Sequence, residues 1–216
     1  MLITPVDQMI EVKKVLKEAD ELNKSNNYTE AELLYNRIIT QHPDFPDARH
    51  NLAVCLIKQN KLSDALPHIE SLLKTKYPMY EYFLTGGKFY LAYKKYQKAK
   101  DNLDKAIEID ENRFEAFYFK GILFSLIRNY EGAEVNYRKC LLFDSNNTDF
   151  LNKYGITLVS LKKYNEALFY FNKMKDINKK SFDAWANLGY CYQKLLKYKE
   201  GIKAYEAAIE IEPENS

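Results

Sequence analysis

Histidine and cysteine are the side chains best suited to metal binding or nucleophilic chemistry, and this chain has three of each. No HExxH motif and no cluster of acidic ligands accompanies the histidines, so they predict no metal site. The cysteines are widely spaced without a CxxC pair, which favours small buried side chains with reduced thiols, as in a cytoplasmic protein, over a redox centre. The six residues are His42, His50, His68, Cys55, Cys140 and Cys191.

A second candidate for chemistry is the stretch TGGKF, Thr85–Phe89, which has part of the pattern of a phosphate-binding loop. Tyr82 stands where that loop needs its first glycine, and Phe89 stands where it needs the hydroxyl that binds magnesium. No Ser–His–Asp or Cys–His arrangement is suggested either. The sequence therefore predicts no catalytic residues, no metal and no cofactor, and we expect that the chain is not an enzyme.

Composition narrows the class of protein further. The chain is 46% hydrophobic with only 7 Gly and 6 Pro, which argues against a disordered or an all-β chain. No apolar run is long enough for a membrane span, and the start lacks the pattern of a signal peptide. The net charge of +2 does not predict a nucleic-acid partner. We expect a cytoplasmic protein without membrane insertion.

A short stretch near the end, WANLGYCY, shows how the helices must be arranged. Trp185, Leu188, Gly189 and Tyr192 share one face of a helix, and a glycine there indicates that another helix passes close by. Counting back in steps of 34 residues from Gly189 finds only glycine or alanine. A second small residue and two large, mostly aromatic ones repeat in the same phase. The small residues of the first series are Gly155, Gly121, Gly87, Ala53 and Ala19.

This pattern resembles the tetratricopeptide repeat (TPR), a helix–turn–helix unit of 34 residues with W-x2-L-G-x2-Y, a small-x3-aromatic pair and a terminal proline. The resemblance implies an all-α fold, an α-solenoid built as a right-handed superhelix of antiparallel helix pairs. Arg49 departs from the pattern because it replaces a large apolar residue. Of the 18 tyrosines, ten fall on the aromatic positions of the repeat, so we interpret them as core and not as an RNA-stacking surface.

The repeats predict the domain organisation. We expect a short N-terminal extension at 1–11, followed by a TPR array at 12–216. Its units are predicted at 12–45, 46–79, 80–113, 114–147, 148–181 and 182–215.

The resemblance also implies a binding site. In TPR proteins a concave groove is lined by the first helix of each unit, at its positions 2, 5, 6, 9, 12 and 13, and binds a peptide or a helix. Apolar residues at these positions in repeats three to five favour that function. The clamp that grips chaperone tails is missing, so such tails are not expected to bind. The predicted groove residues are Leu84, Lys88, Leu91, Tyr118, Phe119, Ile122, Leu126, Asn152, Lys153, Ile156, Asn187, Tyr190 and Lys194.

Two functions remain open at this point. The first is a protein–protein interaction scaffold without chemistry of its own. The second is the N-terminal TPR region of a larger enzyme, such as a bacterial-type glycosyltransferase, because the stretch Ala31–Val54 is similar to TPR regions that precede such domains.

A further expectation concerns the apolar residues of the last helix, at the carboxyl end. Ile202, Ile209 and Ile211 should include residues that face water, because no following unit covers the last helix. We expect the native chain to continue past Ser216, and we expect self-association through this end in its absence.

Overall fold

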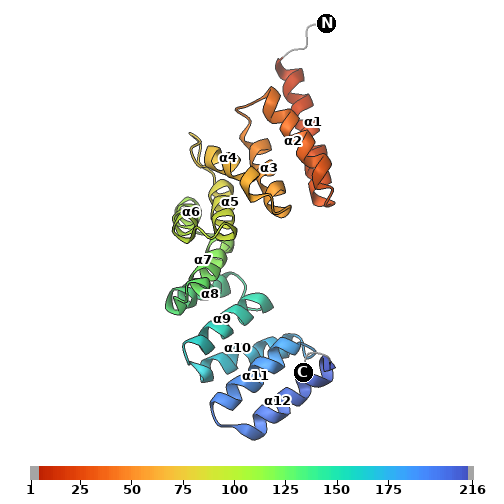
Figure 1. The fold of residues 1–216 in the computed structure, drawn as a ribbon. Helices are drawn as coiled ribbons and strands as arrows, with labels where there is room; N and C mark the ends of the chain where they lie inside the picture. The colour runs from red at the N-terminus through yellow and green to blue at the C-terminus, as the bar shows by residue number, and fades with distance from the viewer. Residues whose placement is uncertain (1–4, 214–216) are drawn as a thin grey trace. The chain divides into compact units, whose positions relative to one another are not determined.

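The computed structural model describes residues 5–213 and contains, over that range, twelve α-helices and no strand. The chain forms two compact units, residues 1–109 and 110–216. The first unit holds α1 (Pro5–Lys24), α2 (Tyr28–Gln41), α3 (Pro46–Lys58), α4 (Leu62–Leu72), α5 (Tyr80–Ala92) and α6 (Tyr96–Ile109). The second holds α7 (Phe114–Leu126), α8 (Tyr130–Phe143), α9 (Thr148–Ser160), α10 (Tyr164–Ile177), α11 (Phe182–Lys194) and α12 (Tyr198–Ile211). Within each unit the helices follow one another as antiparallel pairs (Figure 1), which confirms the all-α prediction.

Helices α3, α5, α7, α9 and α11 start at residues 46, 80, 114, 148 and 182, the first residues of the predicted second to sixth repeats. Helix α1 is longer than the other first helices, since it begins at Pro5 and has 20 residues against their 13. Most of the predicted N-terminal extension is therefore helical. Residues 1–4 and 214–216 lie outside the described part of the chain.

The repeated glycines are the points where the two helices of a pair come closest. A Cβ atom built on Gly155 would lie 2.5 Å from Cε1 of Phe171, and one built on Gly121 would lie 2.5 Å from Cε1 of Tyr137. Gly87 faces Leu103 in the same way. Each partner is the large residue sixteen positions later, on the second helix of the pair. The glycine in WANLGYCY is thus explained, because Gly189 lies against the ring of Tyr205.

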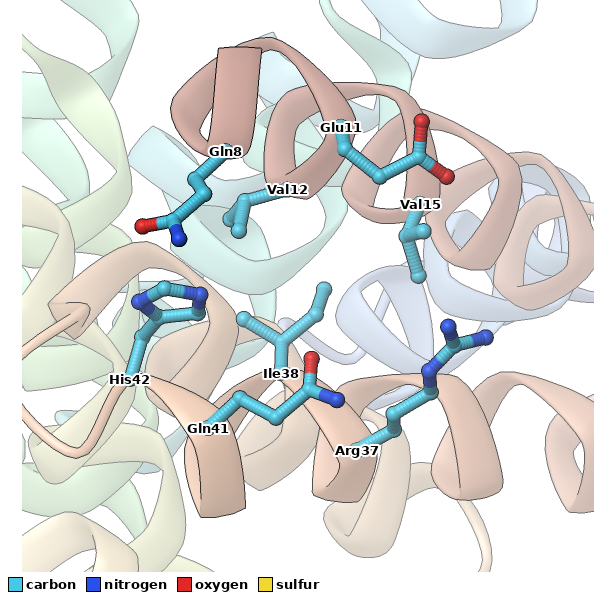
Figure 2. A pocket seen from close by; sticks show the side chains of 8 residues that line it. All are labelled: Gln8, Glu11, Val12, Val15, Arg37, Ile38, Gln41 and His42. Carbon is cyan, nitrogen blue, oxygen red and sulfur yellow. The ribbon is translucent and has the colours of Figure 1, made fainter. Parts of the chain in front are cut away.

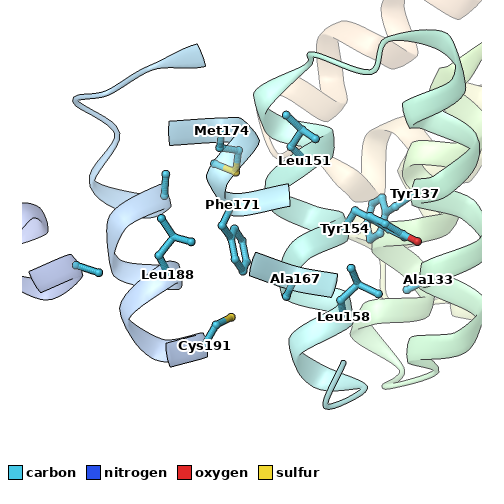
Figure 3. Packing of buried hydrophobic residues seen from close by; sticks show 12 residues of the cluster. Ala133, Tyr137, Leu151, Tyr154, Leu158, Ala167, Phe171, Met174, Leu188 and Cys191 are labelled. Carbon is cyan, nitrogen blue, oxygen red and sulfur yellow. The ribbon is translucent and has the colours of Figure 1, made fainter. Parts of the chain in front are cut away.

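The second unit is held together by one buried cluster that runs from α8 to α12 (Figure 3). Phe171, Leu158 and Leu151 are fully buried at its centre, and Leu188 and Cys191 of α11 continue it. Small residues such as Ala167 and Ala184, also fully buried, allow the helices to approach. Because neighbouring pairs share this cluster, a single pair would expose its apolar face, which is the physical basis of a solenoid.

All six turns inside the helix pairs have the same left-handed geometry. The middle residue of each three-residue turn has φ between 55° and 63°. The following backbone N–H donates to a carbonyl five residues earlier, over 2.8–2.9 Å, as in the Schellman motif. The first two turns place Asn26 and Asn60 there, which tolerate this conformation. The other four place residues without that preference, namely Lys94, Arg128, Lys162 and Leu196.

Arg49 departs from the apolar pattern of its repeat position, but it makes the same kind of hydrogen bond as Trp185, the residue at that position in the sixth repeat. Its Nη2 donates to the carbonyl of Pro43, six residues earlier, over 2.6 Å. Trp185 stands at the same position of the sixth repeat, and its Nε1 donates to the carbonyl of Lys179, also six residues earlier, over 2.9 Å. The guanidinium group therefore satisfies the same kind of backbone carbonyl as the indole N–H.

Candidate functional site

The predicted groove residues lie on the first helices of the pairs and are divided between the two units. Leu84, Lys88 and Leu91 are on α5 of the first unit, and the remaining ten are on α7, α9 and α11 of the second. We call these ten residues the second-unit face. They are Tyr118, Phe119, Ile122, Leu126, Asn152, Lys153, Ile156, Asn187, Tyr190 and Lys194.

In the first unit, the predicted residues offer little binding surface. Leu84 is only 7% exposed, so its side chain belongs to the interior of the unit. Lys88 and Leu91 are half-buried. Sequence reasoning did not anticipate this crowding, which arises because α5 also buries Tyr82, Phe83 and further large residues on several sides.

Polar side chains on the first helices of this unit are instead bonded to one another. Asp20 of α1 accepts a hydrogen bond from Tyr35 Oη and another from Asn51 Nδ2, both at 2.7 Å. His50 of α3 lies 3.2 Å from the Asn51 side-chain oxygen through Nδ1 and 2.8 Å from Thr85 Oγ1 through Nε2. These five side chains, which we call the first-unit polar chain, connect α1, α2, α3 and α5. Asn51 carried a signal in the sequence because it occupies the same repeat position as Asn187, and Tyr35 did so because it lies on an aromatic position of the repeat.

Burial sets the protonation states of His50 and Tyr35 in the first-unit polar chain. It lowers the pKa of His50, although the carboxylates of Asp47 and Glu81 act in the opposite direction, so the imidazole is neutral near pH 7. Burial also raises the pKa of Tyr35, and the neighbouring Asp20 carboxylate adds to the effect. The Tyr35 hydroxyl therefore remains a hydrogen-bond donor. The result is a joined and satisfied network without a reactive group.

On α7 of the second unit, the second-unit face is aromatic and aliphatic. The Tyr118 ring packs edge-on against Phe119, with centroids 5.4 Å apart, and lies tilted against the Phe150 ring, with centroids 5.7 Å apart. Burial, followed by a hydrogen bond to Asp149, raises the pKa of Tyr118. Ile122 packs partly against the buried cluster, whereas Leu126 is 56% exposed. Leu126 is therefore the freest apolar side chain on this helix face.

On α9 and α11, the second-unit face becomes polar and positively charged. Asn187 Nδ2 donates to Asn152 Oδ1 over 3.2 Å, which joins the two helices. Ile156 and Tyr190 remain 43% and 38% exposed. The Lys194 ammonium lies 5.1 Å from the centre of the Tyr190 ring, a cation–π distance.

Two lysines of this face have no carboxylate partner in the described part of the chain, namely Lys153 and Lys194. Elsewhere in the second unit, ion pairs are common. The buried Glu134 carboxylate lies 2.9 Å from Lys163 and 3.1 Å from Arg138. The second-unit face therefore combines apolar side chains on α7 with unpaired positive charge on α9 and α11.

A cavity of about 500 Å³ lies elsewhere, between α1 and α2 of the first unit (Figure 2). Val12, Val15 and Ile38 supply its apolar side chains, while its polar ones are those of Gln8, Glu11, Arg37, Gln41 and His42. Val15 holds the repeat position that Phe83, Phe117 and Trp185 hold later in the chain. A similar hollow of about 460 Å³ lies beside the large Arg49 at the same repeat position, so the small size of Val15 does not account for the cavity, which contains no predicted groove residue.

The remaining candidates for chemistry lie in structural positions. All three cysteines are buried, and burial raises the pKa of Cys140 to about 12 and that of Cys191 to about 11. Across residues 5–213, no group of three or more His, Cys, Asp or Glu side chains is placed to hold a metal ion. Within the same described range, no helix has the length and apolar character that crossing a membrane requires.

The stacked pairs, close glycine contacts and shared core define the chain as an α-solenoid. Sequence profiles described as tetratricopeptide repeat match residues 22–78, 81–113 and 182–215. The chain belongs to the tetratricopeptide-repeat family. No curated protein matches the sequence.

Solved structures with the same fold are TPR proteins of low sequence identity. YrrB, described as a TPR protein with an unusual peptide-binding site, is 21% identical, with a TM-score of 0.73 over 83% of this chain and 93% of YrrB. The C-terminal part of a TPR protein from Cytophaga hutchinsonii is 21% identical, with a TM-score of 0.80 over 91% of this chain and 78% of its own. MamA from Desulfovibrio magneticus is 17% identical, with a TM-score of 0.73 over 80% of this chain and 98% of the MamA chain. The family and the fold support a protein-interaction scaffold.

Proposed function

We propose that the chain is a scaffold that binds a peptide segment of another protein on the second-unit face, without catalysing a reaction. The observation that carries this proposal is the exposure of apolar side chains on first helices, where a solvent-facing surface is normally polar. Ile156 and Leu126 are 43% and 56% exposed on this face. The description of YrrB as a peptide-binding TPR protein is consistent with the same kind of ligand.

The second-unit face is a better candidate than the first helices of the first unit. In the first unit, the polar side chains already satisfy one another, and a peptide would have to break those hydrogen bonds. In the second unit, the Lys153 and Lys194 ammonium groups have no carboxylate partner among the described residues. A ligand with an apolar segment over α7 and an acidic or carbonyl-rich segment over α9 and α11 would match this arrangement.

The test is to select peptides from a random phage-displayed library on the purified chain and to measure their binding by calorimetry. Ile156→Asp and Lys153→Glu should weaken binding at least about tenfold, because an unpaired carboxylate would lie in the contact. Phe119→Asp should have the same effect. Ile122→Asp is less informative, since Ile122 also packs against the core and its replacement will disturb folding.

A matched control comes from the second helices. Val135 of α8 is 57% exposed and lies outside the second-unit face, so Val135→Asp should leave peptide binding unchanged. Circular dichroism would show that every variant keeps its helices. If the selected peptides bind Ile156→Asp and Lys153→Glu as tightly as the unmodified chain, the binding site is elsewhere and the proposal is wrong.

A further inference from the structure

Helix α12 presents two different sides. Toward α11 it places Gly201, Ala204 and Ala208, all buried. The other side exposes Tyr198 by 58%, Ile202 by 57% and Ile209 by 44%, so the interpretation of the repeat tyrosines as core is wrong for Tyr198. A hollow of about 160 Å³, lined by Gln193, Tyr198, Gly201, Ile202 and Tyr205, opens beside these residues. The expectation that apolar residues of the last helix face water is therefore met for Ile202 and Ile209.

The order of residues on this side has the spacing of a helix-pairing seam. Tyr198, Ile202, Tyr205 and Ile209 follow one another at intervals of four, three and four residues, which is the a/d pattern of a coiled coil. Tyr205 is half-buried, because its ring also packs against Gly189 of α11. The residue after each of these four is charged and exposed. This flanking row is Lys199, Lys203, Glu206 and Glu210. We call the apolar row and its flanking row together the α12 seam.

The charges of the flanking row are separated along the helix. Its first half is basic, with Lys199 and Lys203, and its second half is acidic, with Glu206 and Glu210. When two identical helices pack antiparallel, the same flank of each lies beside the other and runs in the opposite direction. The basic half of one copy would then face the acidic half of the other. Ile202 would lie near the partner's Tyr205, and Ile209 near the partner's Tyr198. In a parallel arrangement the flanking row of each copy would lie beside the opposite flank of the other, so the two charged rows would not meet.

We propose that two copies of the chain associate through the α12 seam as an antiparallel, two-fold symmetric helix pair. The surface is complementary to itself in both the apolar row and the charged row, as an interface between identical subunits requires. The hollow beside Ile202 provides space for an apolar side chain of the second copy. One helix per subunit covers less than the ~800 Å² per partner of a standard interface, so the dimer is reversible and depends on concentration.

Charge reversal gives the sharpest test, with the association of the full chain measured by sedimentation velocity over a wide concentration range. Lys199→Glu with Lys203→Glu makes the flanking row wholly acidic, and Glu206→Lys with Glu210→Lys makes it wholly basic. Each variant alone should dimerise at least about tenfold more weakly, since like charges then meet along the whole row. An equimolar mixture of the two should form a mixed dimer at least as stable as the native one, because opposite charges then meet throughout.

Two further variants separate the seam from general surface effects. Ile202→Glu with Ile209→Glu should remove dimerisation. A charge-matched control, Lys139→Glu with Lys180→Glu, alters two exposed lysines outside α12 and should leave it unchanged. All substituted positions are exposed, so circular dichroism should report native helicity in each case.

Two results would overturn the proposal. One is a native chain that remains monomeric across the whole range. The other is dimerisation that does not depend on the seam. In that case the Ile202→Glu/Ile209→Glu variant would still dimerise, or the two charge-reversed variants would form no dimer when mixed.

Discussion

Replacing Gly155 by alanine should destabilise the second unit, although alanine is the better helix former. In a helix interior, alanine is favoured over glycine by about 1 kcal/mol. At Gly155, however, the added Cβ would lie 2.5 Å and 2.7 Å from two ring atoms of Phe171. Phe171 is fully buried, so its ring cannot move aside without displacing the surrounding core. Overpacking of this kind costs about 1–3 kcal/mol, and the very short contact places Gly155 at the upper end. We expect a net loss of about 2 kcal/mol.

Gly201 supplies the matched control for this substitution. It also lies inside a helix, but a Cβ added there would meet its nearest atom at 3.5 Å, an ordinary van der Waals distance. Gly201→Ala should therefore keep the intrinsic gain of about 1 kcal/mol. Urea unfolding followed by circular dichroism would place the two variants on opposite sides of the unmodified chain, about 3 kcal/mol apart.

A double-mutant cycle tests whether the Phe171 ring is the cause. Phe171→Leu removes the ring edge that opposes Gly155, so Gly155→Ala should be better tolerated in that background than in the native one. A Gly155→Ala variant as stable as Gly201→Ala would refute the interpretation of the repeated glycines as close helix contacts.

Three other predictions concern the turns, the first-unit polar chain and the end of the fifth pair. Leu196→Gly should raise the free energy of unfolding in urea by about 0.5–1 kcal/mol, because Leu196 has φ of 60°, which glycine adopts without steric cost, and its side chain is 70% exposed. Leu195→Gly is the control and should show no gain, since Leu195 has φ of −90°. Stability should fall as the pH is lowered through 6.5, because burial lowers the pKa of His50 below that value and only the unfolded chain then takes up the proton. Thermal unfolding at several pH values should show a smaller loss for His50→Gln, and an equal loss would contradict a role for this imidazole. Trp185→Phe should lower the free energy of unfolding by about 1 kcal/mol, because it removes the hydrogen bond to the Lys179 carbonyl and weakens the contact with Lys175. An unchanged midpoint of urea unfolding would show that this hydrogen bond contributes nothing.

The sequence alone predicted the helix pairs and their contacts because both depend on a strict period. A glycine that recurs every 34 residues, opposite a large residue sixteen positions later, leaves little freedom in how the two helices pack. The exposure of Ile202 and Ile209 was predictable from their place on the second helix of the last repeat, which no following unit covers. At the glycines, one residue type at one repeat position determines the contact.

Other features depend on neighbours that the period does not reveal. Leu84 occupies a groove position of its repeat but is buried, because α5 carries large side chains on several faces. The role of Arg49 required the structure, since a charged residue at an apolar position gives no sign of the carbonyl that it binds. The first-unit polar chain connects residues up to 35 positions apart, and only the packed helices bring them together.

The uniform turns have a consequence for where the chain can change its length. Every connection inside a pair is three residues long and is closed by a backbone hydrogen bond of 2.8–2.9 Å. One added residue would break that bond and rotate the second helix away from the glycine it packs against, so insertions and deletions are excluded from all six turns. The connection between α4 and α5 spans residues 73–79, three more than the four-residue connection between α2 and α3. Length variation among related chains, and any domain or tag inserted by design, should therefore be tolerated between pairs and not within them.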